Sequence, residues 1–236
     1  MRSYDVIAPF YDVGVGDRSA MAALVRGWIN KHRPDATRVL ELACGTASIL
    51  RALPREWEVW GADLSRGMLR RARAKIPRGH FFCQDMTRFR LDQKFDVIIC
   101  LLDSINHVTG VAGWERTFRR VREHLDEGGV FIFDVYTMRK LRTLDSGAPM
   151  VRRIGRDYFM VTASYRGRGL TNCMIRIFEC VGRRRYRLWA TEIAERALPL
   201  SQIRRSLRRH FNRVLVHGED GRRPSELSDR VYFICQ

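Results

Sequence analysis

The residues best placed to do chemistry in this chain are two acids, each at the end of a short apolar run. Glu41 closes the first run, and Ala43, Gly45 and Ala47 follow it before a helical pattern begins. Asp63 closes the second run, 22 residues after Glu41. A parallel α/β domain binds its ligand at the carboxyl ends of its strands, where small residues let the ligand approach the backbone. An acid at the second strand end can accept both hydroxyl protons of a ribose, so the pattern predicts a nucleoside cofactor.

The spacing of the small residues separates one kind of nucleotide site from others. The dinucleotide fingerprint G-x-G-x-x-G fails because alanine holds its first position and its last position is not a glycine. A P-loop fails because no Lys-Ser/Thr pair follows the glycine. The remaining pattern, Glu41-x-Ala43-x-Gly45-x-Ala47, resembles the first motif of the class I S-adenosylmethionine (SAM) methyltransferases, acid-x-G-x-G-x-G. The resemblance implies SAM as the cofactor.

The elements that must position these residues alternate as in that family. Five strand–helix alternations are expected, and they predict an α/β fold with a Rossmann-like seven-stranded sheet. The expected elements after Asp63 are a helix with Met68, Leu69, Ala72 and Ile76 on one face, a short strand ending near Asp85, a buried strand from Phe95 to Leu102, a helix from Gly113 to Leu125, a turn at Glu127 to Gly129, and a fifth strand.

The resemblance also implies which residues bind the cofactor. An acid after the third strand, here Asp85, receives the adenine amino hydrogen in the family, and the next residue packs on the ring. The cofactor-binding residues implied in this way are Tyr11, Glu41, Ala43, Cys44, Gly45, Asp63, Leu64, Met68, Asp85, Met86, Leu101 and Leu102.

Three residues are candidates for the catalytic step, namely Tyr11, His107 and Tyr136. The pairs Tyr4-Asp5 and Tyr11-Asp12 resemble the opening of small-molecule methyltransferases, which folds over the cofactor and brings a tyrosine near the methyl group. His107, beyond the fourth strand, has an ordinary pKa suited to deprotonating an amine, although a histidine at a strand end is more often structural. Tyr136 follows the fifth strand and is expected to face the same cleft.

The second half of the chain has a different pattern. Alternating residues from Val151 to Ala194 predict antiparallel strands, an amphipathic helix is expected from Ser201 to His210, and two final strands complete the core sheet. We therefore expect a SAM-binding core with an N-terminal lid segment at residues 1–140, an antiparallel β-rich lid insertion over the substrate at 141–198, and a C-terminal helix and strand pair at 199–236.

Two features of the charge distribution each have a functional and a structural explanation. Acids at four strand ends (Glu41, Asp63, Asp85 and Asp103) suggest a cationic ligand, although acids also cap helices. The chain has 43 basic and 26 acidic residues, and residues 141–236 alone contain 20 arginines and 9 acids. A basic surface attracts phosphates, so RNA is an alternative partner, while a solvated helix face is the plainer explanation.

Composition narrows the class of protein further. No apolar run reaches the length of a membrane span, the N-terminus lacks the apolar stretch of a secretory signal, and the six cysteines form no CxxC pair. These features predict a cytoplasmic protein without a metal site. We expect a monomer or homodimer that methylates nitrogen or oxygen of a small metabolite; the alternatives are an RNA methyltransferase and a non-catalytic SAM-binding protein.

Overall fold

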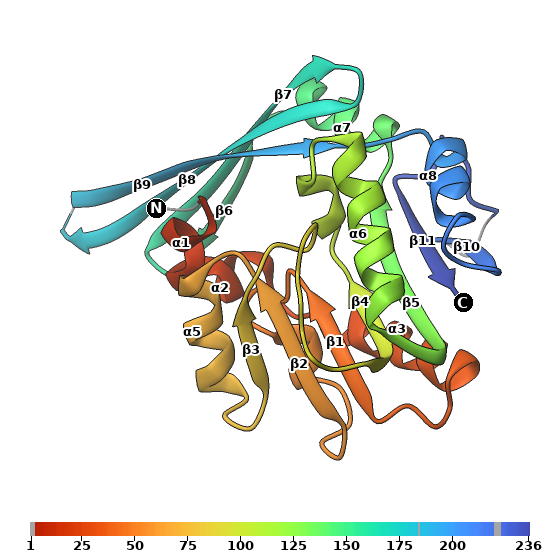
Figure 1. Cartoon of the computed structure of the whole chain (residues 1–236). Coiled ribbons are helices and arrows are strands. Elements are labelled where there is room, and N and C mark those ends of the chain that lie inside the picture. Colours follow the sequence, from red (N-terminus) through yellow and green to blue (C-terminus); the bar gives the residue numbers. More distant parts are fainter. Residues whose placement is uncertain (1–2, 184, 220–222) are drawn as a thin grey trace.

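The fold is built on one seven-stranded sheet, seen in a computed structural model that describes residues 3–183, 185–219 and 223–236. The strand order is β10-β11-β5-β4-β1-β2-β3 (Figure 1). Strands β3, β2, β1, β4 and β5 are parallel to one another, and β11 runs antiparallel to both β5 and β10. The strands are β1 (Arg38–Leu42), β2 (Glu58–Asp63), β3 (His80–Cys83), β4 (Phe95–Cys100), β5 (Leu125–Tyr136), β10 (Val214–Gly218) and β11 (Arg230–Cys235). The predicted seven-stranded sheet is confirmed.

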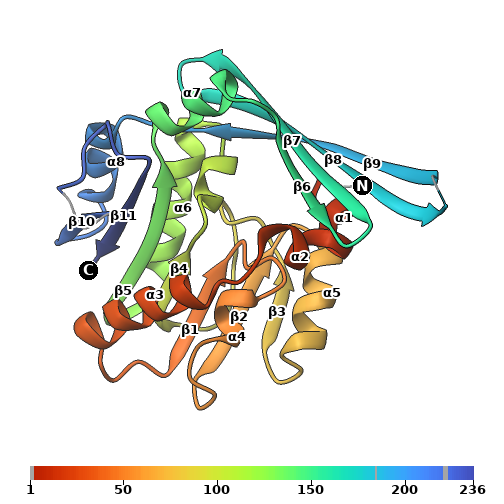
Figure 2. The same ribbon diagram turned by 180° about the vertical axis from the view of Figure 1, so that it is seen from behind.

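Helices bury both faces of this sheet, as the continuous apolar runs of β4 and β5 require. Phe131 and Phe133 of β5 pack on the side of α6 and α8, while Val130 and Ile132 pack on the side of α3. Figures 1 and 2 show these two layers from opposite sides. The helices are α3 (Ser19–His32), α4 (Ser48–Arg51), α5 (Arg66–Lys75), η2 (Ser104–His107), α6 (Val111–His124), α7 (Met138–Ser146) and α8 (Leu200–Leu207).

The expectation of five strand–helix alternations is wrong at one place. Within the described residues 84–94, the connection from β3 to β4 contains no helix. The side chain of Gln84 donates to the Arg90 carbonyl at 2.8 Å and accepts from the Arg90 amide at 2.9 Å, and Phe89 is buried. These contacts hold the segment as a loop, which leaves its first residues at the edge of the sheet.

A second sheet forms the lid. Its order is β6-β7-β8-β9, all antiparallel, with β6 at Met150–Ile154, β7 at Asp157–Gly167, β8 at Leu170–Gly182 and β9 at Arg185–Arg196. The first of the predicted lid strands is in fact two strands, because the chain turns at Gly155, whose φ of +61° favours glycine.

The N-terminal segment joins the lid to the core. It comprises α1 (Ser3–Ile7), η1 (Ala8–Phe10) and α2 (Tyr11–Val15), and Figure 1 shows it between the lid sheet and the ends of the parallel strands. Ile7 and Ala8 pack with Phe159 and Ile177 of the lid and with Met68 of α5 in one apolar cluster. The lid therefore rests on the core through this segment.

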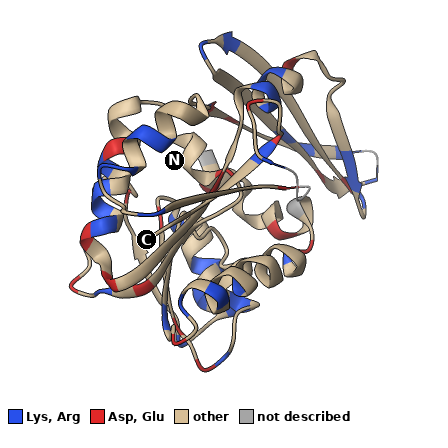
Figure 3. Ribbon diagram, turned by 90° about the vertical axis from the view of Figure 1, so that its right-hand side faces the viewer, with Lys and Arg blue, Asp and Glu red and all other residues tan. Residues whose placement is uncertain are grey.

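Basic residues are spread over several parts of the surface. Figure 3 shows Lys and Arg on helices of the core and near the far end of the lid sheet. Among the described residues, no helix is long and apolar enough to cross a membrane.

Candidate functional site

The loop after β1 has a backbone shape that suits glycine at three positions. Ala43, Gly45 and Ala47 have φ values of +53°, +54° and +60°. For a residue with a Cβ atom, this left-handed conformation costs about 1–2 kcal/mol. The alanines at the first and third positions therefore keep the turn that the glycines of the motif make, and the turn presents the Gly45 amide to the end of β2.

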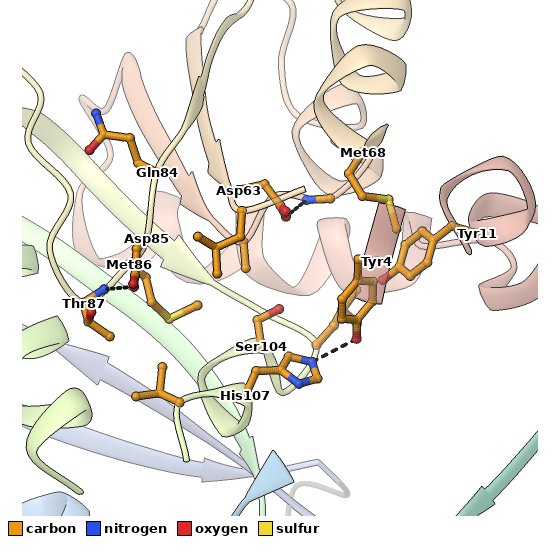
Figure 4. Close-up of a pocket in the computed structure, with 15 residues that line it drawn as sticks. Tyr4, Tyr11, Asp63, Met68, Gln84, Asp85, Met86, Thr87, Ser104 and His107 are labelled. Carbon is orange, nitrogen blue, oxygen red and sulfur yellow. Dashed lines mark hydrogen bonds between the residues drawn. The ribbon is translucent and has the colours of Figure 1, made fainter. Parts of the chain in front are cut away.

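Asp63, at the end of β2, receives this amide. Its Oδ2 accepts from the Gly45 amide at 2.8 Å (Figure 4). Its Oδ1 accepts from the Ser65 amide at 2.7 Å. Burial raises the pKa of Asp63, and the backbone donors of Ser65, Gly45 and Leu64 oppose the shift. Each carboxylate oxygen can accept more than one hydrogen bond, so capacity remains for the two hydroxyls of a ribose.

A cavity of about 280 Å³ lies at this edge of the sheet (Figure 4). Asp85 turns the chain after β3 by accepting from the Thr87 amide at 2.9 Å. Apolar side chains, among them Leu64, Met86 and Val108, line the cavity together with Asp85. The lining residues are Tyr4, Tyr11, Ala43, Gly45, Asp63, Leu64, Met68, Gln84, Asp85, Met86, Thr87, Leu102, Ser104, His107 and Val108.

A narrow extension of about 30 Å³ adjoins this cavity and holds Glu41, Cys44 and Leu101. The Glu41 Oε2 and the Arg18 Nε are buried in it, and neither has a hydrogen-bond partner among the described residues. Burial, together with the nearby Asp63, raises the pKa of Glu41 well above its ordinary value. A carboxyl oxygen and a guanidinium nitrogen that lack partners among the described residues, both in one small space, suit the ammonium and carboxylate of an amino acid. The residues present thus fit the methionine part of SAM, and Arg18 is a residue that the sequence analysis missed.

Both Tyr-Asp pairs place an aspartate on the core and a tyrosine in the cavity. Asp5 accepts from the Ser65 hydroxyl at 2.6 Å and from the Gly67 amide at 2.8 Å, at the start of α5. The Tyr4 hydroxyl lies 3.0 Å from the His107 Nε2, and its ring meets the Tyr11 ring edge to face. This anchoring makes Tyr4 and Tyr11 a wall of the cavity (Figure 4).

The second pair is held in the same way at the other side of the cavity. Asp12 accepts from the Lys75 ammonium at 2.7 Å and from the Ser48 hydroxyl at 3.2 Å. Thr46, in the loop after β1, also donates to Asp12. The N-terminal segment is thereby fixed to the loop that carries the first motif.

A second cavity, of about 330 Å³, lies on the other side of the tyrosine wall and under the lid. Tyr4, Tyr11 and Leu102 line both this cavity and the first. Apolar side chains of the lid form its roof, including Phe159 and Ile175. Its charged and polar lining includes Arg18 before α3, Glu195 of the lid, and three residues at the ends of core strands, Asp103, Tyr136 and Arg230.

Arg230 contacts charged and aromatic groups on one side of the second cavity. It donates to Asp103 at 2.8 Å and to Asp134, and its guanidinium lies 4.3 Å from the centre of the Tyr136 ring. Asp103 was expected to offer a free carboxylate to a cationic ligand; it is instead paired. The sequence analysis missed Arg230 and Asp134. Their signals were an arginine at the start of the last apolar run and an acid inside the fifth, since a charge in a buried strand needs a partner.

Glu195 is a further residue that the sequence analysis missed. It is 6% exposed, and burial raises its pKa to about 7 although Arg230 opposes the shift. Its signal was an acid at an inward position of an alternating strand. His107 shows the opposite shift, because burial lowers its pKa to about 4. The premise that His107 titrates near neutrality is therefore not met.

The structure brings most of the candidate residues together. Nine of the twelve implied cofactor residues line the first cavity, and Glu41, Cys44 and Leu101 line its extension. Of the catalytic candidates, Tyr11 lines both main cavities, His107 the first and Tyr136 the second. Among the described residues, no cluster of three or more His, Cys, Asp or Glu side chains could hold a metal ion.

Comparison with known proteins identifies the family. Residues 39–129 match the methyltransferase domain family. A dTDP-3-amino-3,4,6-trideoxy-alpha-D-glucopyranose N,N-dimethyltransferase from Streptomyces venezuelae is 30% identical over 167 residues, which are 69% of each chain. Matches to two other curated methyltransferases span only 48% and 52% of those proteins.

Solved structures share the fold over nearly the whole chain. An S-adenosylmethionine-dependent methyltransferase from Clostridium acetobutylicum superposes with a TM-score of 0.82 at 23% identity, over 94% of this chain and 92% of that one. The sugar N-methyltransferase KedS8 from Streptoalloteichus superposes with a TM-score of 0.79 at 23% identity, over 96% and 91%. With its motif, its fold and these relatives, the chain belongs to the class I SAM-dependent methyltransferases and is an enzyme with SAM as its cofactor.

Proposed function

We propose that this enzyme methylates the nitrogen of a small-molecule amine of the amino-sugar class. The observation that carries the proposal is the wall that the two cavities share. Tyr4, Tyr11 and Leu102 face the cofactor cavity on one side and the lid cavity on the other. An acceptor in the lid cavity would meet the cofactor's methyl group at this wall. Holding the two reactants in line at close range supplies several kcal/mol of the barrier.

Nitrogen is favoured over oxygen by the charges in the lid cavity. Asp103 and Glu195 face Arg230, whose charge is already shared with the buried Asp134. Together with Asp134 these carboxyl groups outnumber the guanidiniums of Arg230 and Arg18, so the region suits a substrate ammonium. The Streptomyces venezuelae relative acts, by its name, on an amino sugar, which supports the same class here.

The roles of the chain's residues follow from their positions. When bound, SAM supplies an electrophilic methyl group on a sulfonium. We assign Asp63 to the ribose hydroxyls, Asp85 and Met86 to the adenine, and Glu41 and Arg18 to the amino-acid end. Tyr4 and Tyr11 orient the acceptor, and the apolar lid excludes water from the lid cavity.

Other properties stay predictions. We retain the division into a core at 1–140, a lid at 141–198 and a C-terminal part at 199–236, because β6–β9 form their own sheet while β10 and β11 return to the core. The cytoplasmic location, the monomeric or dimeric state and the alternative of an RNA substrate are untested.

The test is methyl transfer from radiolabelled SAM to three acceptors. These are dTDP-3-amino-3,4,6-trideoxy-α-D-glucopyranose, the same sugar nucleotide with a hydroxyl in place of the amine, and total RNA. We expect label in the amine alone, and mass spectrometry of the product will show one or two added methyl groups. Label in the hydroxyl analogue or in RNA, with none in the amine, would refute the proposal.

A further inference from the structure

The Glu195 carboxyl lies in the lid cavity, and one of its oxygens lacks a hydrogen-bond partner among the residues that the structure describes. Glu195 lies near the end of β9, lines the lid cavity and is 6% exposed. Its Oε2 is buried and has no hydrogen-bond partner in the described parts of the chain. Asp103, on the same cavity, has its Oδ1 bound to Arg230 at 2.8 Å. A buried acceptor without a donor is costly, so it marks a place for a ligand's donor.

The backbone on both sides of Glu195 is fastened to the core. The Asn106 side chain donates to the Arg196 carbonyl and to the Tyr136 carbonyl, both at 3.1 Å. The His107 ring is hydrogen-bonded to the backbone of Ala194. The lid strand is therefore fixed immediately before and after Glu195, and its carboxyl has a defined position relative to the tyrosine wall.

The groups that face Glu195 come from five elements around it. The one cation among them, a guanidinium, is already paired with two carboxylates. The others are a carboxyl group, two phenols and a thiol, and burial is the main cause of the raised pKa of each. They are Tyr4 of α1, Asp103 after β4, Tyr136 of β5, Cys173 of β8 and Arg230 of β11. From α7, Lys140 lies over the Tyr136 ring and is paired with Asp229. This surrounding leaves a substrate ammonium as the natural donor to Glu195.

We propose that Glu195 binds the amino group of the substrate and accepts its proton before methyl transfer, an inference that rests on the proposed N-methylation. The ammonium gives one proton to the carboxylate, which leaves a neutral amine and a neutral carboxylic acid. The amine lone pair then forms the N–C bond, and the C–S bond breaks with its electron pair passing to sulfur. The positive charge thus moves from sulfur to the methylated nitrogen, and Glu195 returns its proton to solvent when the site opens.

The acidity of the neighbouring groups agrees with this assignment. Burial raises the pKa of Glu195 to about 7, so the carboxyl exchanges its proton near neutral pH. Burial lowers the pKa of His107 to about 4, so this imidazole is a weak base. Burial raises the pKa of Tyr11 to about 12, so this phenol is a weak acid.

The experiment compares wild type, Glu195→Gln and the matched control Glu192→Gln. Glu192 lies on the same strand but is exposed, and it accepts from Asn172. With dTDP-3-amino-3,4,6-trideoxy-α-D-glucopyranose as the probe, we expect Glu195→Gln to lower kcat/KM by about 100-fold or more, the usual scale of general base catalysis. Its acid limb near pH 7 should move to higher pH, while Glu192→Gln should keep the wild-type profile.

A titration of the carboxyl group tests the same idea without turnover. In protein labelled with carbon-13 at the glutamate carboxyl, one resonance should titrate near pH 7 and be missing from Glu195→Gln only. Titration of Glu195 in the ordinary glutamate range would overturn the inference, as would a wild-type kcat/KM and pH profile in Glu195→Gln. If wild type methylates the hydroxyl analogue but not the amine, the proposed function fails and the inference fails with it. If both wild type and Glu195→Gln methylate the amine equally, the inference alone fails.

Discussion

Replacing Glu195 by Gln is expected to stabilise the folded protein while it impairs catalysis. Burial moves the pKa of Glu195 from 4.5 to about 7. Each pKa unit corresponds to about 1.4 kcal/mol, so the ionised carboxylate lowers the free energy of unfolding by about 3 kcal/mol once the pH exceeds 7. Glutamine is neutral at all these pH values and has nearly the same shape, so the variant escapes this loss.

The sign of the pH dependence follows from the direction of the shift. Because the pKa is higher in the folded state than in the unfolded chain, the folded state binds the proton more tightly between pH 4.5 and 7. Stability therefore falls as the pH rises through this window in wild type. The advantage of Glu195→Gln should be about 3 kcal/mol at pH 8 and less than about 1 kcal/mol at pH 5.

Urea denaturation at the two pH values measures this difference, with Glu192→Gln as the control for a loss of charge on the same strand. Glu192→Gln should follow wild type at both pH values because its side chain is exposed. If Glu195→Gln and wild type lose the same stability between pH 5 and pH 8, the carboxyl is not held in the environment described above and the reasoning is refuted.

Three other substitutions test the cofactor site, the buried ion pair and the N-terminal segment. Asp63→Ala should weaken SAM binding by about 10- to 100-fold, because hydrogen bonds to a charged group contribute about 1.5–3 kcal/mol; unchanged calorimetric affinity would remove Asp63 from the cofactor site. Arg230→Met should lower the free energy of unfolding by about 3–5 kcal/mol in urea denaturation, because it leaves Asp134 buried and unpaired; adding Asp134→Asn should restore part of the loss, and no recovery would contradict the pairing. Asp12→Asn removes the negative charge paired with the Lys75 ammonium and should speed limited proteolysis of the N-terminal segment several-fold, with a change of about 1 kcal/mol or less in global stability; equal cleavage rates would show that other contacts hold the segment.

The parallel core could be predicted because its signals are local. The runs that became β1, β4 and β5 are buried on both faces, and a strand of that kind reads as a continuous apolar stretch. The small residues after β1 also indicated a tight turn, because the backbone conformation of this loop depends on its own residues. The count of five alternations shows the limit of this logic: it implies a helix after every strand, whereas a side-chain bridge between Gln84 and Arg90 holds residues 84–94 as a loop.

The charged side of the lid cavity could not be predicted because it depends on distant pairings. Arg230 and Asp103 are 127 residues apart in the chain, and their contact exists only because β11 inserts beside β5. Glu195 reaches the cavity only in the register that pairs it with Thr171 of β8, and a shift by one residue would turn it to the other face. The local pattern marks a charged residue within a strand, but neither register can be read from it, so the partner of that charge stays unknown.

The repeated Tyr-Asp pairs show how a short segment can complete a site that the core sheet leaves open. Each aspartate binds a different strand end: Asp5 joins the start of α5 beyond β2, and Asp12 joins Thr46 in the loop after β1. The cofactor contacts proposed for Asp63 lie between these two attachment points. Binding of the cofactor would therefore stabilise the same loops that hold the segment, and the segment in turn supplies Tyr4 and Tyr11 as the wall against the lid cavity. The N-terminal segment thus couples the cofactor loops to the acceptor cavity, so binding of the cofactor should strengthen binding of the acceptor.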